Sequence, residues 1–250
     1  MNIKEKLNII EVLQNSMQEI SSQKKKLWWE RYMKNVISFR GVGIPEIRKL
    51  QKSWYLTYLN ELPYEEQIEI AVEFFRCEKA EDKLAGVLLF QNYLFDKMPV
   101  AYMLDQYRIL FDENLIYDWN ICDWFCVRVL NPTIKKYDEE AIEIISSWRN
   151  EEYLWKARAS VVAFVGSTNH DKYYKSIGEN CLSLIKREER FAKTSVGWIL
   201  HDIYKENESF VYDFIDENLI HFSKESLKNA TKHCSDEVKK NYLKKFKEII

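Results

Sequence analysis

Glycine and proline are scarce in this sequence, with six Gly and four Pro among 250 residues. A many-stranded β fold needs more of both, because its frequent tight turns depend on them. Hydrophobic residues make up 46% of the chain and charged residues 30%, which is enough apolar material for a sizeable buried core. We therefore predict a fold that is almost entirely α-helical.

Paired cysteines and long apolar segments are also missing. The five cysteines are an odd number, and Cys122 and Cys126 lie one helical turn apart, a spacing typical of small core residues. This usage predicts a reducing, cytoplasmic compartment. No N-terminal signal pattern and no apolar run of about eighteen residues occurs, so we expect neither secretion nor a membrane partner.

The sequence lacks an excess of positive charge, since its formal net charge is −2 and its pI is near 6.2. Many nucleic-acid-binding domains are basic overall. Lys and Arg nevertheless cluster locally, within residues 24–26, 186–190, 224–232 and 239–247. Such clusters predict either solvated helix faces or one basic binding face.

Apolar periodicity predicts successive helices along the whole chain. We expect an amphipathic helix in the first twenty residues, a second from Lys24 to the pair Gly41 and Gly43, and a third from Pro45 to about Asn60. From residue 63 onward a unit of about forty residues recurs, built from two helices and two connections. The predicted pairs are 63–77 with 79–95, 99–111 with 115–131, 138–149 with 151–166, 171–185 with 188–205, and 207–218 with 223–234, followed by a last helix at 236–249.

A repeat of this length is typical of HEAT-type arrays, in which each helical hairpin buries its apolar face against its neighbours. We predict an all-α, HEAT-like helical repeat array that forms one domain over residues 1–250. The second helices of such pairs usually line a concave groove, so unusual residues on them are candidates for function.

Three second helices carry such residues. Asp123 interrupts an otherwise apolar surface one turn after Trp119, so its carboxylate pairs with a neighbour or lines a solvated cleft. Arg158 lies among apolar neighbours and must snorkel, pair with a carboxylate or meet a ligand phosphate. Trp198 lies on the polar side of its helix, and the adjacent Gly197 would let a bulky partner approach the backbone.

These residues recur close to the repeat interval. Asp123 and Arg158 are 35 positions apart, Arg158 and Trp198 are 40 apart, and His233 follows 35 positions later. Each would stand at a similar height on adjacent repeats. The spacing predicts that their side chains converge on one cleft.

Five segments together resemble the AlkD-type DNA alkylation repair family, which consists of glycosylases built from HEAT-like repeats. They are RYMKNVISFRGVGIPEIRKLQK (31–52), DWNICD (118–123), LWKARAS (154–160), RFAKTSVGWIL (190–200) and ESLKNATKH (225–233). They occur in the family's order and spacing over essentially the whole chain. The resemblance implies a groove that holds double-stranded DNA and an activity that excises purines alkylated at N3 of adenine or N7 of guanine.

The resemblance also implies roles for individual residues. Trp119 and Asp123 match the catalytic Trp-x-x-x-Asp pattern, Arg158 the motif arginine, and Trp198 the Gly-Trp aromatic residue. These four residues are the predicted catalytic set. The predicted DNA contacts are Tyr32, Lys34, Lys193, Lys228 and Lys232. Asp118, Thr194 and His201 depart from the family's usual residues, and these changes remove positive charge from the groove or alter its wall. No metal or cofactor is expected, and we expect a monomer.

The chemistry of the implied reaction suits a carboxylate. An N3- or N7-alkylated purine is already a cation and leaves without a general acid. The positive charge that develops on the sugar would be stabilised by Asp123. Two other functions fit the same array: a non-catalytic binder of damaged or branched nucleic acid, and a scaffold that binds a protein.

Overall fold

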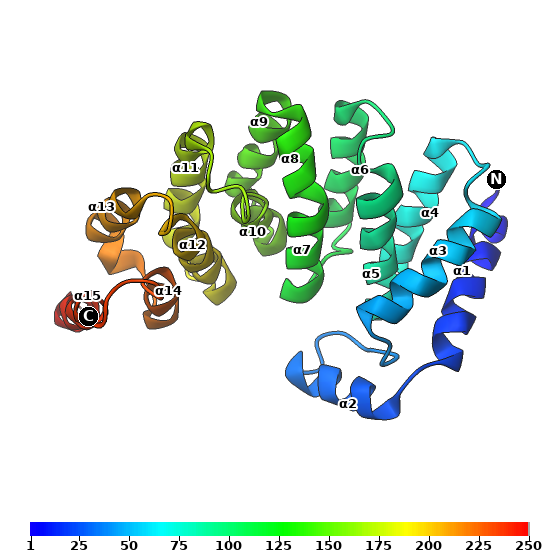
Figure 1. Ribbon diagram of the computed structural model, residues 1–250, viewed down its shortest axis with the longest axis horizontal. Coiled ribbons are helices and arrows are strands. Elements are labelled where there is room, and N and C mark those ends of the chain that lie inside the picture. Colours follow the sequence, from blue (N-terminus) through cyan, green and yellow to red (C-terminus); the bar gives the residue numbers. More distant parts are fainter. Residues whose placement is uncertain (250) are drawn as a thin grey trace. The chain divides into compact units, whose positions relative to one another are not determined.

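The computed structural model describes residues 1–249, and Figure 1 shows helices joined by short connections. Over these residues no strand forms, apart from one isolated parallel bridge between Ser38 and Lys79. None of the helices within residues 1–249 is long and apolar enough to cross a bilayer. The predicted all-α helical repeat fold is confirmed.

Backbone contacts divide the chain into two compact units, Met1–Val129 (unit 1) and Leu130–Ile250 (unit 2). One domain over the whole chain stays a prediction.

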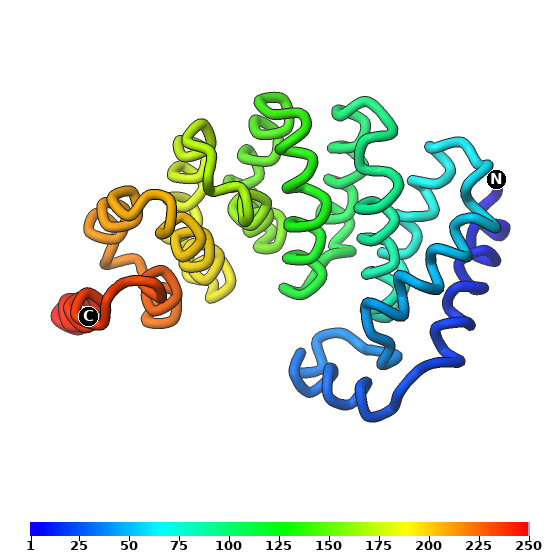
Figure 2. The backbone as a smooth tube through the Cα atoms, in the orientation of Figure 1, coloured from blue at the N-terminus to red at the C-terminus, as the bar shows by residue number. Residues whose placement is uncertain are grey.

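Unit 1 consists of a stack of helices, traced from blue to green in Figure 2. Its elements are α1 (Ile3–Glu19), α2 (Gln23–Tyr32), α3 (Ile44–Tyr58), α4 (Tyr64–Arg76), α5 (Ala80–Leu89), the π-helix η1 (Phe90–Leu94), α6 (Val100–Asp112), α7 (Trp119–Phe125) and the π-helix η2 (Cys126–Leu130), which reaches the boundary. Helix α5 packs between α3 and α7, while α4 packs against α6. The second helices of successive pairs therefore lie side by side, as a HEAT-like array requires.

Helix α2 is shorter than the sequence predicts, because it ends at Tyr32 rather than at Gly41. Lys34 and Asn35 take left-handed backbone angles, with φ of 53° and 58°, which terminate a right-handed helix. Beyond them Ile37 and Phe39 are buried two residues apart, the period of an extended segment. The apolar residues after α2 thus belong to a buried extended connection and not to the helix.

Unit 2 repeats the paired arrangement. Its elements are α8 (Asn131–Tyr137), α9 (Glu139–Ser147), the 3-10 helix η3 (Trp148–Asn150), α10 (Leu154–Val162), the 3-10 helix η4 (Asp171–Tyr173), α11 (Tyr174–Ile185), α12 (Arg190–Ile203), α13 (Glu208–Asn218), the 3-10 helix η5 (Leu219–His221), α14 (Lys224–Ala230) and α15 (Asp236–Ile249). Helix α12 packs between α10 and α14, and α11 packs between α9 and α13. Apart from α8, the α-helices from α4 onward lie inside the predicted ranges to within one residue.

Helix α8 occupies residues that were predicted to be a connection. The predicted break at residue 131 was wrong, since the helical backbone continues from η2 through Pro132, whose ring is tolerated in the first turn of α8. The π-helix η2 precedes it and absorbs the change in helical register. The break comes instead at Asp138, whose φ is 48°.

The side chains of Cys122 and Cys126 are fully buried, and their sulfur atoms lie 4.0 Å apart without forming a disulfide. Their prediction as small core residues is confirmed. Gly197 is also explained by packing: a Cβ there would lie 2.5 Å from the carbonyl oxygen of Ser226. The bulky partner that the sequence predicted at this glycine is the backbone of α14.

Candidate functional site

Helix α7 presents two predicted catalytic residues one turn apart. Asp118 caps the helix, because its Oδ1 accepts the N–H of Ile121 at 3.0 Å. Trp119 is the first residue of α7 and Asp123 follows four residues later, so the indole and the carboxylate share one face of the helix. Both side chains are partly exposed. A ligand can therefore reach this pair.

The cap itself is a buried acid. Asp118 is 1% exposed, and its Oδ2 forms no hydrogen bond within residues 1–249. Burial raises the pKa of Asp118 to about 6, against the lowering effect of the Ile121 and Asn120 N–H groups and of Lys83, and the nearby Asp123 raises it further. The proton on this cap consequently comes off close to neutral pH, five residues from the predicted catalytic carboxylate.

Aromatic rings connect α7 to α2. The Tyr32 ring meets the Trp119 ring edge to face at 5.6 Å, and it stacks on Trp28 at 5.4 Å with only 5° between the planes. Trp29 lies against Tyr32 on one side and against Phe39 on the other. We call Trp28, Trp29, Tyr32, Phe39 and Trp119 the aromatic patch. It holds the predicted groove residue Tyr32 against the predicted catalytic residue Trp119.

Helix α2 buries no residue of its own, so other groups must hold it. The carboxylate of Glu81, which is 1% exposed, accepts the N–H groups of Arg40, Gly41 and Val42 at 2.9, 2.7 and 3.1 Å. Gly41 has φ of 93°, and a Cβ there would lie 2.2 Å from the carbonyl oxygen of Ser22 at the start of α2. The contact between Gly41 and Ser22 therefore fixes the start of α2, and the aromatic patch fixes its end.

In unit 2 the predicted arginine is already engaged. Arg158 is 4% exposed, and its Nη1 donates to the carbonyl oxygen of Phe191 at 2.6 Å and to Oγ1 of Thr194 at 3.4 Å. The guanidinium thus ties α10 to α12. Lys193 behaves similarly, because its Nζ donates to the carbonyl oxygen of His221 at 2.6 Å.

The remaining predicted lysines are exposed. Lys34 in unit 1 and Lys228 and Lys232 in unit 2 form no ion pair over residues 1–249. Positive charges without a carboxylate partner are available to an anionic ligand. These three lysines fit the predicted contact with DNA phosphates.

Trp198 is partly exposed on α12, and no ring of residues 1–249 stacks on it. One turn later, the His201 ring stacks on His233 at 4.3 Å. Burial lowers the pKa of His201, and the neighbouring His233 and Lys232 lower it further. His201 is therefore mostly neutral near pH 7 and adds little positive charge beside Trp198.

The sequence of the chain from residue 13 to residue 234 matches the family described as DNA alkylation repair enzyme. The chain belongs to this family. A solved structure, "Predicted DNA alkylation repair enzyme from Enterococcus faecalis", has a similar fold, with a TM-score of 0.73 and 14% identity, covering 86% of this chain and 97% of that one. At this identity the similarity shows the fold. Comparison with curated proteins finds none that matches.

For this DNA alkylation repair protein the structure also shows cations that the sequence analysis missed. Arg48 on α3 donates to the side-chain oxygens of Gln91 at 3.0 Å and Asn92 at 3.4 Å. Burial and the positive charge of Arg128 on η2 lower the pKa of Arg48. Two guanidinium groups near one another suit an anion. Neither residue stands out in sequence, because each lies in an ordinary amphipathic pattern.

No group of three or more His, Cys, Asp or Glu within residues 1–249 is placed to hold a metal ion. Unit 1 of this repair protein carries a carboxylate, a row of aromatic rings and cations. Unit 2 carries a partly exposed indole and exposed lysines.

Proposed function

We propose that this member of the DNA alkylation repair family is a DNA glycosylase that hydrolyses the N-glycosidic bond of cationic alkylated purines, such as 3-methyladenine and 7-methylguanine, in duplex DNA. The observation that carries the proposal is the pair on α7. The partly exposed carboxylate of Asp123 stands one turn from Trp119, whose ring is supported by Tyr32.

The reaction needs little proton transfer, because the alkylated purine departs as a neutral base. As the bond to the base stretches, the deoxyribose becomes an oxocarbenium-like cation. The carboxylate of Asp123 stabilises that charge and orients the water that attacks the sugar. The ring face of Trp119 stabilises the cationic base, a contact of about 0.5 to 2 kcal/mol.

Unit 2 offers DNA contacts of its own. Trp198 presents a partly exposed ring to DNA, and Lys228 and Lys232 contact phosphates. Arg158, already bonded to the Phe191 carbonyl, contributes mainly by holding α10 and α12 in place. The proposal requires no cofactor, and it assigns the chain to the cytoplasm as a monomer.

Replacing Asp123 tests the mechanism. Asp123→Asn keeps the shape of the side chain and removes its charge, so single-turnover release of 7-methylguanine from methylated duplex DNA should fall by about a hundredfold or more. Binding of the same duplex should stay unchanged or become slightly tighter, because a negative charge near phosphates is lost. Asp105→Asn, an exposed carboxylate on α6, is the matched control and should excise at the parent rate.

Equal release by the folded Asp123→Asn variant and the parent would refute the role of Asp123. A parent protein that binds methylated duplex and releases no base would instead support a non-catalytic binder of damaged DNA.

A further inference from the structure

A pocket of about 620 Å³ lies along α2, outside the pair on α7. Its lining residues are Ser22, Lys24, Lys25, Leu27, Trp28, Trp29 and Arg31. None of the predicted catalytic or DNA-binding residues lines it. The pocket combines apolar ring surface with three cationic side chains, and all of it belongs to unit 1.

The cations and rings share one face of the helix. Counted from Trp28, the other members lie at the positions that a helix brings to the same side, three and four residues away. They are Lys24, Lys25, Arg31 and Tyr32. Along this face Lys24 and Lys25 come first, the Trp28 ring follows one turn later, and Arg31 and the Tyr32 ring follow after another turn.

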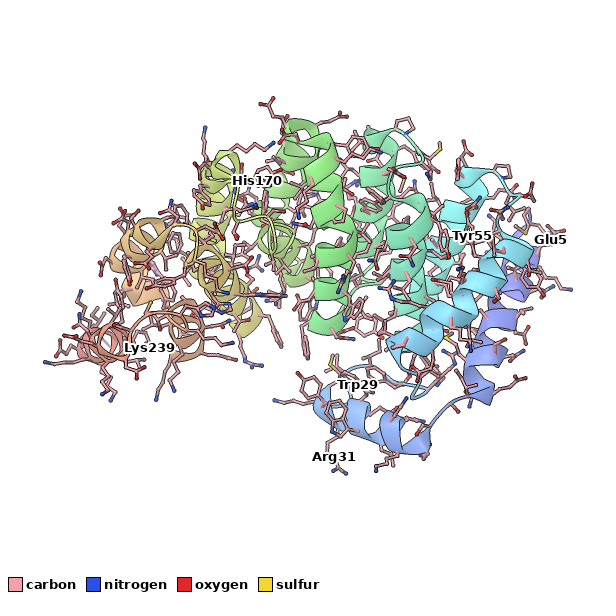
Figure 3. The ribbon with its side chains drawn as sticks, viewed as in Figure 1. Glu5, Trp29, Arg31, Tyr55, His170 and Lys239 are labelled. Atoms are coloured by element: carbon pink, nitrogen blue, oxygen red, sulfur yellow. The ribbon has the colours of Figure 1, made fainter. Side chains whose placement is uncertain are left out.

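This face is largely unused within the protein. Trp28 is 56% exposed and Tyr32 is 52% exposed, although both carry large apolar rings. Lys24 and Arg31 form no ion pair within residues 1–249, and Lys25 meets Glu46 only at the solvent-exposed surface, at 3.3 Å. Figure 3 shows Arg31 projecting away from the rest of unit 1. An amphipathic helix with no buried residue has its apolar surface available for a ligand.

We propose that this face of α2 is a binding site for unpaired nucleotides of single-stranded DNA. Trp28 is already stacked on Tyr32 at 5.4 Å, so the ring is held in place before a ligand arrives. An exposed, prepositioned ring binds the face of an unpaired base, while flanking Lys and Arg side chains bind the backbone phosphates. In a fully paired duplex both faces of each base are covered by neighbouring bases, and the ring has nothing to stack on.

The proposal rests on DNA as the partner in the proposed function, and it does not depend on excision. The rings run continuously from Trp28 through Tyr32 to Trp119, with 5.4 Å and 5.6 Å between successive centroids. A strand bound on α2 therefore ends next to the predicted catalytic helix. Unpaired nucleotides beside a lesion would be held by this site.

Fluorescence anisotropy with a labelled oligothymidylate of about twelve nucleotides tests the proposal on the full chain. Trp28→Ala should weaken binding of this single strand by about tenfold or more, and Trp28→Phe should restore most of it. Both variants should lose several-fold less affinity for a fully paired duplex than for the single strand, because Trp28 supports Tyr32 but finds no uncovered base face in a duplex. Arg31→Ala should weaken single-strand binding a few-fold and make it less dependent on salt.

Two matched controls lie elsewhere in unit 1. Tyr64→Ala removes a ring that is 41% exposed at the start of α4, and Lys4→Ala removes an exposed charge on α1. Both should bind the single strand like the parent. Thermal unfolding of each variant establishes that it is folded.

Unchanged single-strand binding by Trp28→Ala would overturn the proposal. A parent that binds an acidic aromatic peptide through Trp28, and no single strand, would overturn it in favour of a protein partner. The glycosylase proposal is tested separately on the same preparations: a parent that releases no 7-methylguanine and still binds the single strand through Trp28 refutes excision and supports this site.

Discussion

The cations on and just after α2 in unit 1 have different surroundings from those on α10 and α12 in unit 2. In unit 1, Lys24, Arg31 and Lys34 have no carboxylate partner within residues 1–249, and the first two line a pocket together with the exposed Trp28 ring. In unit 2, Arg158 and Lys193 donate at 2.6 Å to the backbone carbonyls of Phe191 and His221. Lys and Arg side chains in similar sequence patterns thus form hydrogen bonds within the protein in one place and face solvent in the other.

A cation in an amphipathic helical pattern is therefore not by itself evidence for a phosphate contact. A guanidinium bonded to a backbone carbonyl of the next helix mainly stabilises the array, because removing it takes away a hydrogen bond that joins two helices. The lysines without partners are better candidates for binding DNA.

The largest effect is expected at the connection that holds α2. Glu81→Ala leaves the N–H groups of Gly41 and Val42 buried without an acceptor, so the free energy of unfolding should fall by about 3 to 5 kcal/mol. Urea denaturation measures this free energy. The control Glu78→Ala, which removes an exposed acid nearby, should change the free energy of unfolding by less than about 0.5 kcal/mol. A loss below about 1 kcal/mol for Glu81→Ala would show that α2 is held by its rings alone.

Asp118 should make the stability of the protein depend on pH. Its folded pKa of about 6 exceeds the unfolded value, so its contribution to stability is complete below about pH 4 and is lost as the pH rises through 6. Asp118→Asn keeps a side-chain oxygen that can cap α7 and removes the ionisable carboxyl group. The free energy of unfolding of the variant should therefore equal that of the parent at pH 4 and exceed it at pH 7 by on the order of 3 kcal/mol. Urea denaturation across this range measures the difference, and parallel curves would contradict it.

Arg158 should behave as a structural residue. Arg158→Met removes the donor to the Phe191 carbonyl and should lower the free energy of unfolding by about 2 kcal/mol. Arg190→Met breaks only an exposed pair with Glu225 and should cost less than about 1 kcal/mol. If both variants unfold like the parent while Arg158→Met loses DNA affinity, Arg158 is a ligand contact and the division between the units fails.

The smallest effects separate two lysines of unit 2. Lys193→Met should cost about 1 kcal/mol of stability, because the His221 carbonyl loses its donor, and Lys228→Met should cost almost none. For duplex binding, the larger effect should come from Lys228→Met. Lys228→Met should reduce the slope of affinity against salt by about one, and Lys193→Met should leave it nearly unchanged. A larger change in the slope for Lys193→Met would assign a phosphate contact to the bonded lysine.

Local pattern determined much of this protein. Scarce Gly and Pro and the helical periodicity specified an all-α repeat, and the spacing of Trp119 and Asp123 placed indole and carboxylate on one face of α7. Both inferences hold because they depend only on neighbours within a turn or two, whose geometry a helix fixes. The end of α2 was missed because left-handed φ values at Lys34 and Asn35 are not visible in an apolar pattern.

Tertiary structure alone decided which partners the site residues have. Tyr32 meets Trp119, Arg158 meets the Phe191 carbonyl, and Glu81 meets the connection after α2, across 33 or more residues of sequence. A side chain's hydrogen-bonding capacity is set by its chemistry, but the group that satisfies it is set by how helices distant in sequence pack. The sequence therefore identifies which residues are unusual, and the fold determines whether each binds the protein or remains available to DNA.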